Sequence, residues 1–147
     1  LIPDFQGNKR NIDRIVEAAP DVVSHNVETV KRLTRKVRVQ AKYDTSLEVL
    51  EYLKAQGVRR TKSGIMLGLG EEESEVIQTL HDLKEAQVDV VTIGQYLQPS
   101  KTHLPVQNFI SPDQFKKYEA IGRDLGFIHV ESGPLVRSSY KAHKHML

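Results

Sequence analysis

Side chains of three different chemistries gather in residues 24–29, Ser-His-Asn-Val-Glu-Thr, directly after an apolar stretch. His25 brings an imidazole, Asn26 an amide and Glu28 a carboxylate. Asn26 can donate and accept hydrogen bonds, and Glu28 can accept them from an amine or from sugar hydroxyls. This set suits a small, polar, zwitterionic ligand. The alternative is structural, because Asn26 could cap a following helix whose positive end Glu28 would favour.

Glycines mark a second candidate segment, residues 62–71, with the sequence Lys-Ser-Gly-Ile-Met-Leu-Gly-Leu-Gly-Glu. Glycine at a strand end lets a flat ring approach the backbone closely. A dinucleotide fingerprint fails here, because its third glycine would fall on Glu73. The acids at 71–73 would also repel a pyrophosphate. We therefore expect a loop that admits adenine without a polyphosphate, or else a tight strand-to-helix turn.

Residues 95–100, Gln-Tyr-Leu-Gln-Pro-Ser, follow the most apolar run of the chain. Their aromatic ring and proline could form a flat surface against which a planar ligand packs, or could simply end a strand. His103 lies in a polar loop, where a lone histidine is usually solvated. His143 and His145 could chelate a metal weakly, although a terminal tail is the simpler interpretation.

Two adjacent hydroxyls, Ser138 and Ser139, lie between Arg137 and Tyr140 beyond the last expected strand. A serine nucleophile needs a nearby base, and the neighbouring residues offer none. Judged by this chemistry alone, residues 131–140 form a turn.

The composition narrows the classes of protein. The 147 residues suit one domain, and 39% hydrophobic with 27% charged residues is the balance of a globular protein. A net charge of +2, with acids among the basic residues, gives no indication of nucleic-acid binding. No apolar run is long enough to span a bilayer. The absence of cysteine excludes disulfides and thiolate ligands within these residues.

Apolar spacing predicts strands and helices in alternation. We expect strands at 1–5, 21–24, 65–69, 88–93 and 127–130, and helices whose apolar stripes run over 12–19, 27–37, 47–53, 76–83 and 115–125. Pro20 ends the first helix, a Thr45–Glu48 capping box opens the third, and Ser111 opens the last. The pattern predicts βαβ units with a parallel sheet, an α/β fold. The units are too few to close an eight-stranded barrel, so we expect an open or partial one.

Taken together, four segments resemble the lipoyl synthase family of radical S-adenosylmethionine enzymes. They are residues 24–29 (SHNVET), 62–71 (KSGIMLGLGE), 91–99 (VTIGQYLQP) and 133–140 (GPLVRSSY), in the order the family has them. The resemblance runs along essentially the whole chain. It implies a partial (β/α)6 TIM-like barrel, with about the last four strand–helix units in residues 1–130 and a C-terminal extension in 131–147.

The resemblance also implies chemistry. Family members carry two [4Fe–4S] clusters, one of which cleaves S-adenosylmethionine to a 5′-deoxyadenosyl radical. The other is held by three cysteines and a serine and is consumed as the sulfur source. Sulfur is inserted at C6 and C8 of a protein-bound octanoyl group. Both cysteine motifs would lie outside these residues, in the N-terminal third of the family, so the chain alone should be inactive.

Site residues follow from the resemblance position by position. It places the serine ligand of the second cluster on Ser139, with Ser138 as the alternative and Arg137 beside it. The S-adenosylmethionine contacts that it implies are Asn26, Glu28, Arg38, Lys62, Gly64, Gly68, Gln95 and Tyr96.

The implied partners are an octanoylated lipoyl carrier domain or glycine cleavage H protein, and an electron donor such as a ferredoxin or flavodoxin. The family is cytoplasmic in bacteria and mitochondrial or plastidic in eukaryotes. Two alternatives stay open: a cysteine-free nucleoside-binding module, and a different barrel enzyme using carboxylates for acid–base work.

Overall fold

The computed structural model describes residues 1–146 and contains one parallel sheet of four strands in the order β1-β2-β3-β4. The strands are β1 (Val22–Ser24), β2 (Arg60–Leu67), β3 (Val90–Gln95) and β4 (His129–Gly133). All three neighbouring pairs are parallel, as the expected βαβ units require. The α/β fold class with a partial barrel sheet is therefore confirmed.

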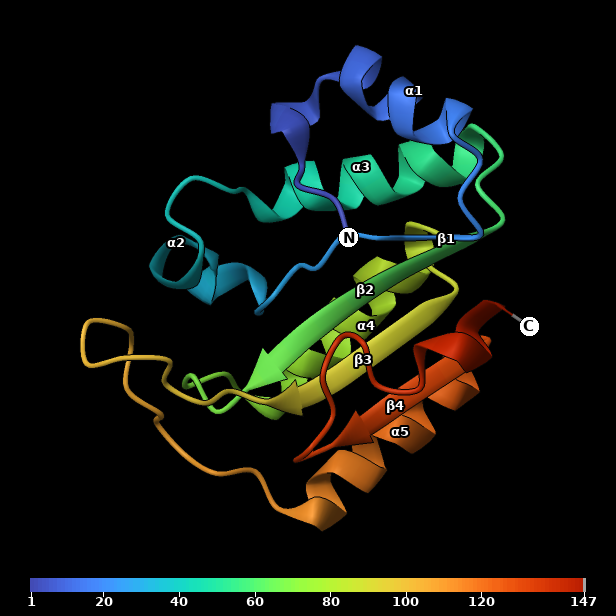
Figure 1. The fold of residues 1–147 in the computed structure, drawn as a ribbon. Coiled ribbons are helices and arrows are strands. Elements are labelled where there is room, and N and C mark those ends of the chain that lie inside the picture. The colour runs from blue at the N-terminus through green and yellow to red at the C-terminus, as the bar shows by residue number, and fades with distance from the viewer. Residues whose placement is uncertain (147) are drawn as a thin grey trace.

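The α-helices lie on one side of this sheet and at its β1 edge, as Figure 1 shows. The elements are η1 (Phe5–Gly7), α1 (Lys9–Glu17), η2 (Lys31–Leu33), α2 (Thr34–Val37), α3 (Tyr43–Ala55), α4 (Glu73–Glu85), α5 (Pro112–Leu125) and η3 (Ala142–Met146). The larger core lies between β2–β4 and helices α4 and α5, and a smaller one joins α1, α3 and β1. The segment after β4 returns across the opposite face of the sheet (Figure 1).

Local sequence signals account for several element ends. Ser111 caps α5 by accepting from the Gln114 amide at 3.2 Å, with Pro112 in the first turn. Gly126 ends α5 in the left-handed conformation with φ of 94°. Glu72 and Glu75 form a capping box at the start of α4, in which the Glu75 carboxylate accepts from the Glu72 amide at 2.9 Å.

The expected helix over residues 27–37 is largely wrong. Only Lys31–Leu33 and Thr34–Val37 are helical, whereas the backbone at Glu28 pairs with β2. The Glu28 amide donates to the Gly64 carbonyl at 3.0 Å, and the Glu28 carbonyl accepts from the Met66 amide at 2.8 Å. These sheet bonds override the local apolar spacing, so Asn26 caps no helix.

Three smaller expectations are also wrong. Residues 1–4 form no strand: the Ile2 amide donates to the Ser24 carbonyl at 2.8 Å, and Pro3, which lacks an N–H, cannot continue the pairing. Helix α3 begins at Tyr43 with Lys42 at its N-cap, so Thr45 and Glu48 lie inside it and form no capping box. Strand β4 runs to Gly133, past the boundary expected at residue 130.

The register of the strands defines the face that carries the site. Partners in a parallel ladder point to the same side, and successive residues alternate. On the face away from the helices, Gly64 lies beside Thr92, and Met66 beside Gly94. Lys62 lies in the next row, beside Ser24 and Val90. We call this side the concave face. No helix among residues 1–146 is long and apolar enough to cross a membrane.

Candidate functional site

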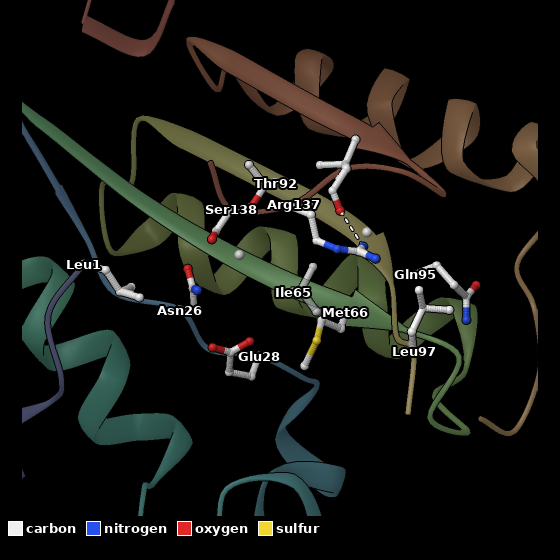
Figure 2. A pocket seen from close by; sticks show the side chains of 13 residues that line it. Leu1, Asn26, Glu28, Ile65, Met66, Thr92, Gln95, Leu97, Arg137 and Ser138 are labelled. Atoms are coloured by element: carbon white, nitrogen blue, oxygen red, sulfur yellow. Dashed lines mark hydrogen bonds between the residues drawn. The ribbon is translucent and has the colours of Figure 1, made fainter. Parts of the chain in front are cut away.

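A cavity of about 370 Å³ lies between the concave face and the segment that returns after β4 (Figure 2). This volume falls within the range of about 300–1,000 Å³ that is typical of small-molecule sites. The cavity is lined by Leu1, Asn26, Glu28, Gly64, Ile65, Met66, Thr92, Gly94, Gln95, Leu97, Val136, Arg137 and Ser138. It therefore brings together residues from all four segments that resemble the lipoyl synthase family.

Asn26 presents an unpaired polar atom to this cavity. Its side-chain oxygen is buried and accepts no hydrogen bond from any residue that the structure describes. Gly64 faces it, and a Cβ at Gly64 would lie 3.0 Å from that oxygen and 2.8 Å from the Thr92 hydroxyl. A glycine is therefore required for the two polar side chains to approach β2. A buried acceptor without a partner is costly, and a donor on a bound ligand would satisfy it.

Glu28 is held by a strained backbone. Its φ is 67°, in the left-handed region that residues with a side chain rarely adopt, although it pairs with β2. Burial raises the pKa of the Glu28 carboxyl, and the Asn26 side chain and the Arg38 cation offset part of this effect. The strain places a partly desolvated carboxylate at the cavity wall, where an ammonium group would be a favourable partner.

Arg38 lies in an adjoining pocket of about 540 Å³, which shares Leu1, Asn26 and Glu28 with the main cavity. Its guanidinium donates to the Val27 carbonyl at 3.3 Å and to the Ser46 hydroxyl at 2.9 Å. Burial lowers the Arg38 pKa, yet the group remains a cation at neutral pH. Arg38 and Glu28 therefore present opposite charges at the junction of the two pockets.

His25 supports this arrangement from behind. Its Nδ1 donates to the Ile2 carbonyl at 3.0 Å, so Nε2 is free to accept from the Ser46 hydroxyl at 2.8 Å. Burial lowers the His25 pKa, which favours this neutral form. His25 is a structural link between residue 2 and α3.

The end of β3 supplies the opposite wall. The Gln95 amide donates to the Tyr96 and Asn108 carbonyls, and its oxygen accepts from the Ile110 amide at 2.9 Å. Gln95 thus lines the cavity while fastening the loop before α5. Tyr96 is 7% exposed and donates to the Leu104 carbonyl at 2.7 Å, and it does not line the cavity.

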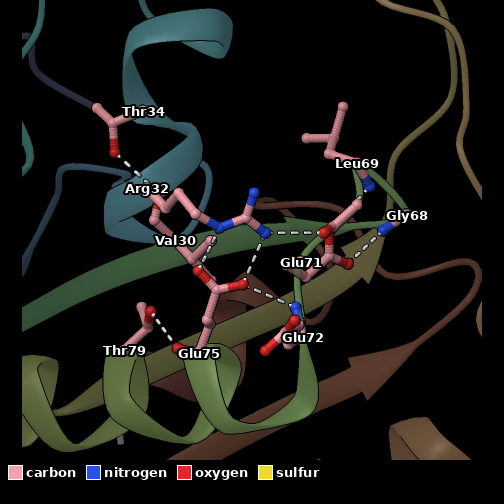
Figure 3. Close-up of polar contacts among 10 residues, drawn as sticks. Val30, Arg32, Thr34, Gly68, Leu69, Glu71, Glu72, Glu75 and Thr79 are labelled. Atoms are coloured by element: carbon pink, nitrogen blue, oxygen red, sulfur yellow. Dashed lines mark hydrogen bonds and ion pairs between the residues drawn. The ribbon is translucent and has the colours of Figure 1, made fainter.

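The loop after β2 is closed by its own acids (Figure 3). The Glu71 carboxylate accepts from the amides of Gly68 and Leu69, which are the groups that a phosphate would need. Arg32 ties the loop to α4 by donating to the Gly70 carbonyl and to Glu75. Gly68 has φ of 105° and lies outside the cavity lining. The tight strand-to-helix turn is therefore the better description of this glycine.

The remaining expected residues divide between two places. Arg137 and Ser138 line the main cavity, whereas Ser139 and Lys62 line only a neighbouring pocket of about 350 Å³, which Ser138 also borders. Lys62 is 4% exposed, and its amine donates to the Ser138 carbonyl and to His145. Lys62 therefore contacts the returning segment and not the main cavity.

Sequence reasoning missed Met66, Thr92, Gly94 and Val136 as lining residues. The first three were open to prediction, because alternation along β2 and β3 places every second residue on the concave face with Gly64. Val136 was not, because a turn was expected over residues 131–140, but the sequence does not indicate which face of the sheet the chain then crosses. Among residues 1–146, no group of three or more histidines or acids could hold a metal ion.

Comparison with known proteins finds relatives that match along nearly the whole chain. The sequence profile described as the radical SAM superfamily matches residues 1–94. Over 146 residues, 99% of the chain, it is 77% identical to "Lipoyl synthase, mitochondrial" of Nematostella vectensis and 79% identical to the lipoyl synthase of Christiangramia forsetii. A more distant relative, the lipoyl synthase of Rubrobacter xylanophilus, is 53% identical over 146 residues.

The chain belongs to the radical SAM superfamily. It spans about half the length of the curated relatives that it matches: 50% of the first two and 45% of the third. The expected resemblance to lipoyl synthases is confirmed along nearly the whole chain.

Proposed function

We propose that this chain forms the cofactor-binding and hydroxyl-bearing half of a lipoyl synthase, which inserts sulfur at C6 and C8 of a protein-bound octanoyl group. The observation that carries the proposal is the cavity of Figure 2, in which Asn26, Glu28 and Gly64 face Ser138 and Arg137. High identity to proteins named lipoyl synthase supports it independently.

The residues present fit S-adenosylmethionine. Glu28 can accept from the ammonium of its methionine part, and Arg38 has N–H groups left for the carboxylate. The unpaired oxygen of Asn26 can accept from a ribose hydroxyl or the ammonium. Gly64 and Met66 give a flat, apolar surface beside Gln95 for the adenine. Lys62 and Gly68 are not part of this pocket.

When bound in turn at a [4Fe–4S] cluster, two equivalents of S-adenosylmethionine would each supply one radical, and each radical would break one of the two C–H bonds. The described residues would do the rest: they hold the methionine part at its two charges, keep the adenine against β2, and keep water from the reacting carbon. The cluster ligands would come from cysteine motifs outside these 147 residues, since the chain contains no cysteine. The chain alone is therefore proposed to be inactive.

For the second cluster, we assign the oxygen ligand to Ser139. An oxygen donor is harder than a thiolate and binds iron of a sulfide cluster less strongly, which suits a cluster that must open to release sulfur. Ser138 is the natural comparison, because it borders both the main cavity and the pocket beside it, whereas Ser139 lines only the latter. Arg137, whose guanidinium donates to the Val136 carbonyl at 3.1 Å, adds positive charge next to both hydroxyls.

Replacing Ser139 with alanine in the intact enzyme should lower sulfur insertion by about 100-fold while S-adenosylmethionine cleavage continues, because only the second cluster loses a ligand. Lipoyl product and 5′-deoxyadenosine, both measured by mass spectrometry, report the two steps separately. Ser138→Ala is the matched control and should keep most of the product. A loss confined to Ser138→Ala would move the ligand to that residue, and full activity in both variants would remove the assignment.

The proposed partner is an octanoylated carrier domain or glycine cleavage H protein, with a ferredoxin or flavodoxin as electron donor. A basic surface supports a protein partner of acidic character. Residues 31–42 contain Lys31, Arg32, Arg35, Lys36, Arg38 and Lys42 and no acid. Lys31 and Arg32 pair with Asp44 and Glu75, whereas the other four form no ion pair among residues 1–146.

This basic segment adjoins the site. Arg38, Gln40 and Ala41 line the pocket that opens beside Glu28, and Val39 between them is 85% exposed. Cations without ion-pair partners surround an exposed apolar side chain here, and such a surface suits the docking of an acidic protein. The docked carrier would lie next to the cavity that its acyl chain must enter.

Reversing two charges, Arg35→Glu with Lys36→Glu, should raise the KM for the carrier protein about tenfold at low salt and leave kcat unchanged, because these side chains act on encounter and not on the chemistry. A short octanoyl-lysine peptide should react as before. The control is the same charge change on α1, Arg10→Glu with Arg14→Glu. Equal KM values in the two double variants would argue against docking at residues 31–42.

The proposed compartment follows from the source: cytoplasmic for a bacterial protein, and mitochondrial or plastidic for a eukaryotic one, as the name of the Nematostella vectensis relative indicates. The competing function, a nucleoside-binding module without radical chemistry, makes a different prediction about the gene. The lipoyl synthase proposal requires two three-cysteine motifs encoded upstream of Leu1. A complete gene without them would favour the binding module.

A further inference from the structure

Lys62 is a buried cation without an acidic partner. It lies on the concave face of β2, between Ser24 and Val90 in the register, and is 4% exposed. It forms no ion pair with any residue from 1 to 146, and burial lowers its pKa while the more distant Glu131 raises it. Burying a charge is costly unless hydrogen bonds compensate it, so the two hydrogen bonds that Lys62 makes have a structural purpose.

Both hydrogen bonds of Lys62 go to the segment that returns after β4. The amine donates to the carbonyl of Ser138 and, at 3.0 Å, to Nδ1 of His145. These partners are 76 and 83 residues away in the sequence. One lysine therefore connects the middle of the sheet to two points of residues 134–146.

His145 is built to accept this hydrogen bond. It is 1% exposed, while its neighbours in η3 are exposed. Burial, the Lys62 cation and the nearby histidines lower its pKa to about 4, so Nδ1 keeps a free lone pair at neutral pH. The proton then lies on Nε2, which is 3.9 Å from the Glu131 carboxylate. The ring also packs near that of His129, at 5.6 Å between centroids.

The other hydrogen bonds of the returning segment are short-range. The amides of Val136, Tyr140 and Ala142 donate to the carbonyls of residues 133, 137 and 139, which shape the turns but do not fix the segment on the sheet. Arg137, Ser138 and Ser139 are all exposed residues. Their position over the sheet thus depends on Lys62 and on the packing of Val136 against Gly94 and Gly133.

We propose that Lys62 and His145 are positioning residues that hold Arg137, Ser138 and Ser139 against the concave face, so that the hydroxyls face the site. The anchoring itself depends only on these contacts, whereas its effect on sulfur insertion rests on the proposed function. Neither residue touches the substrate in this account. Lys62 acts through its hydrogen bond to the Ser138 carbonyl. His145 accepts a hydrogen bond from Lys62 and lines the pocket that also contains Ser139.

The test compares Lys62→Met, Lys62→Arg, His145→Leu and His145→Gln in the intact enzyme. Amide hydrogen exchange at Val136, Tyr140 and Ala142 should become about tenfold faster in Lys62→Met and His145→Leu, because the segment opens more often. Lys62→Arg and His145→Gln keep a donor and an acceptor and should restore part of the protection. His143→Leu, an exposed neighbour in η3, is the control and should exchange like the unchanged enzyme.

Enzyme assays separate positioning from general stability. The kcat for lipoyl formation should fall at least tenfold in Lys62→Met, while the Kd for S-adenosylmethionine stays the same. If Lys62→Met does not fold, His145→Leu tests the same contact from its other side. Unchanged exchange in Lys62→Met, or in His145→Leu where only that variant folds, would overturn the anchor. If the unchanged enzyme forms no lipoyl product, the proposed function is refuted. Faster exchange in Lys62→Met would then still support the anchor.

Discussion

Replacing Gly94 with alanine is expected to lower lipoyl formation by about 100-fold without unfolding the sheet. A Cβ at Gly94 would overlap the carbonyl oxygen of Val136, which is backbone and cannot turn aside. The returning segment, which carries the proposed cluster ligand Ser139, must therefore move away from β3. Displacing a reacting group by about 1 Å can cost about 100-fold in rate.

The matched control lies on the neighbouring strand. Gly133 pairs with Gly94, and a Cβ there would meet only a side-chain carbon of Val136 at an ordinary 3.6 Å. Gly133→Ala should therefore keep most of the activity. Thermal melts followed by circular dichroism would confirm that both variants fold. Comparable activity in the two variants would mean that the returning segment need not lie on β3 for catalysis.

The second large effect concerns the charged end of the pocket. Glu28→Gln and Asn26→Ala should each weaken S-adenosylmethionine binding by about 10- to 100-fold, because a hydrogen bond to a charged group contributes about 1.5–3 kcal/mol. Both clusters should still assemble, since neither residue is a cluster ligand in this account. Equilibrium dialysis gives the affinity, and iron analysis gives the cluster content.

Glu48→Gln provides the control for this pair, because Glu48 is exposed on α3, away from the cavity. It removes the same charge without touching the site. Wild-type affinity in both Glu28→Gln and Asn26→Ala would show that residues 26–28 only complete the sheet. Loss of iron in either variant would instead indicate a structural defect.

The sequence predicted those helices and strands whose start, end and burial depend on residues within the element itself. Helix α5 starts and ends where Ser111 and Gly126 indicate, and β3 is buried along its whole length as its continuous apolar run requires. Asn26, Glu28, Gly64 and Gln95 were expected at the site and do line the cavity. Each of these four residues follows, lies beside or lies within a strand that the apolar pattern predicted.

The errors came from interactions between distant residues. Helical spacing at Val27 and Val30 suggested a helix, but the backbone at Glu28 pairs with β2 instead, at a φ that no local rule predicts. Lys62 was expected at the cofactor, yet the chain returns after β4 and places Ser138 and His145 against it. Such tertiary contacts leave no period or motif in the sequence.

The central claim is that the cavity between Asn26 and Ser138 binds S-adenosylmethionine. The most direct measurement is a crystal structure of the intact enzyme, with its clusters assembled, in complex with S-adenosylmethionine. Our account predicts the methionine part between Glu28 and Arg38, the oxygen of Asn26 accepting from the ligand, and the adenine beside Gly64. Ligand density elsewhere, with Asn26 still unpaired and Glu28 free of contacts, would contradict it.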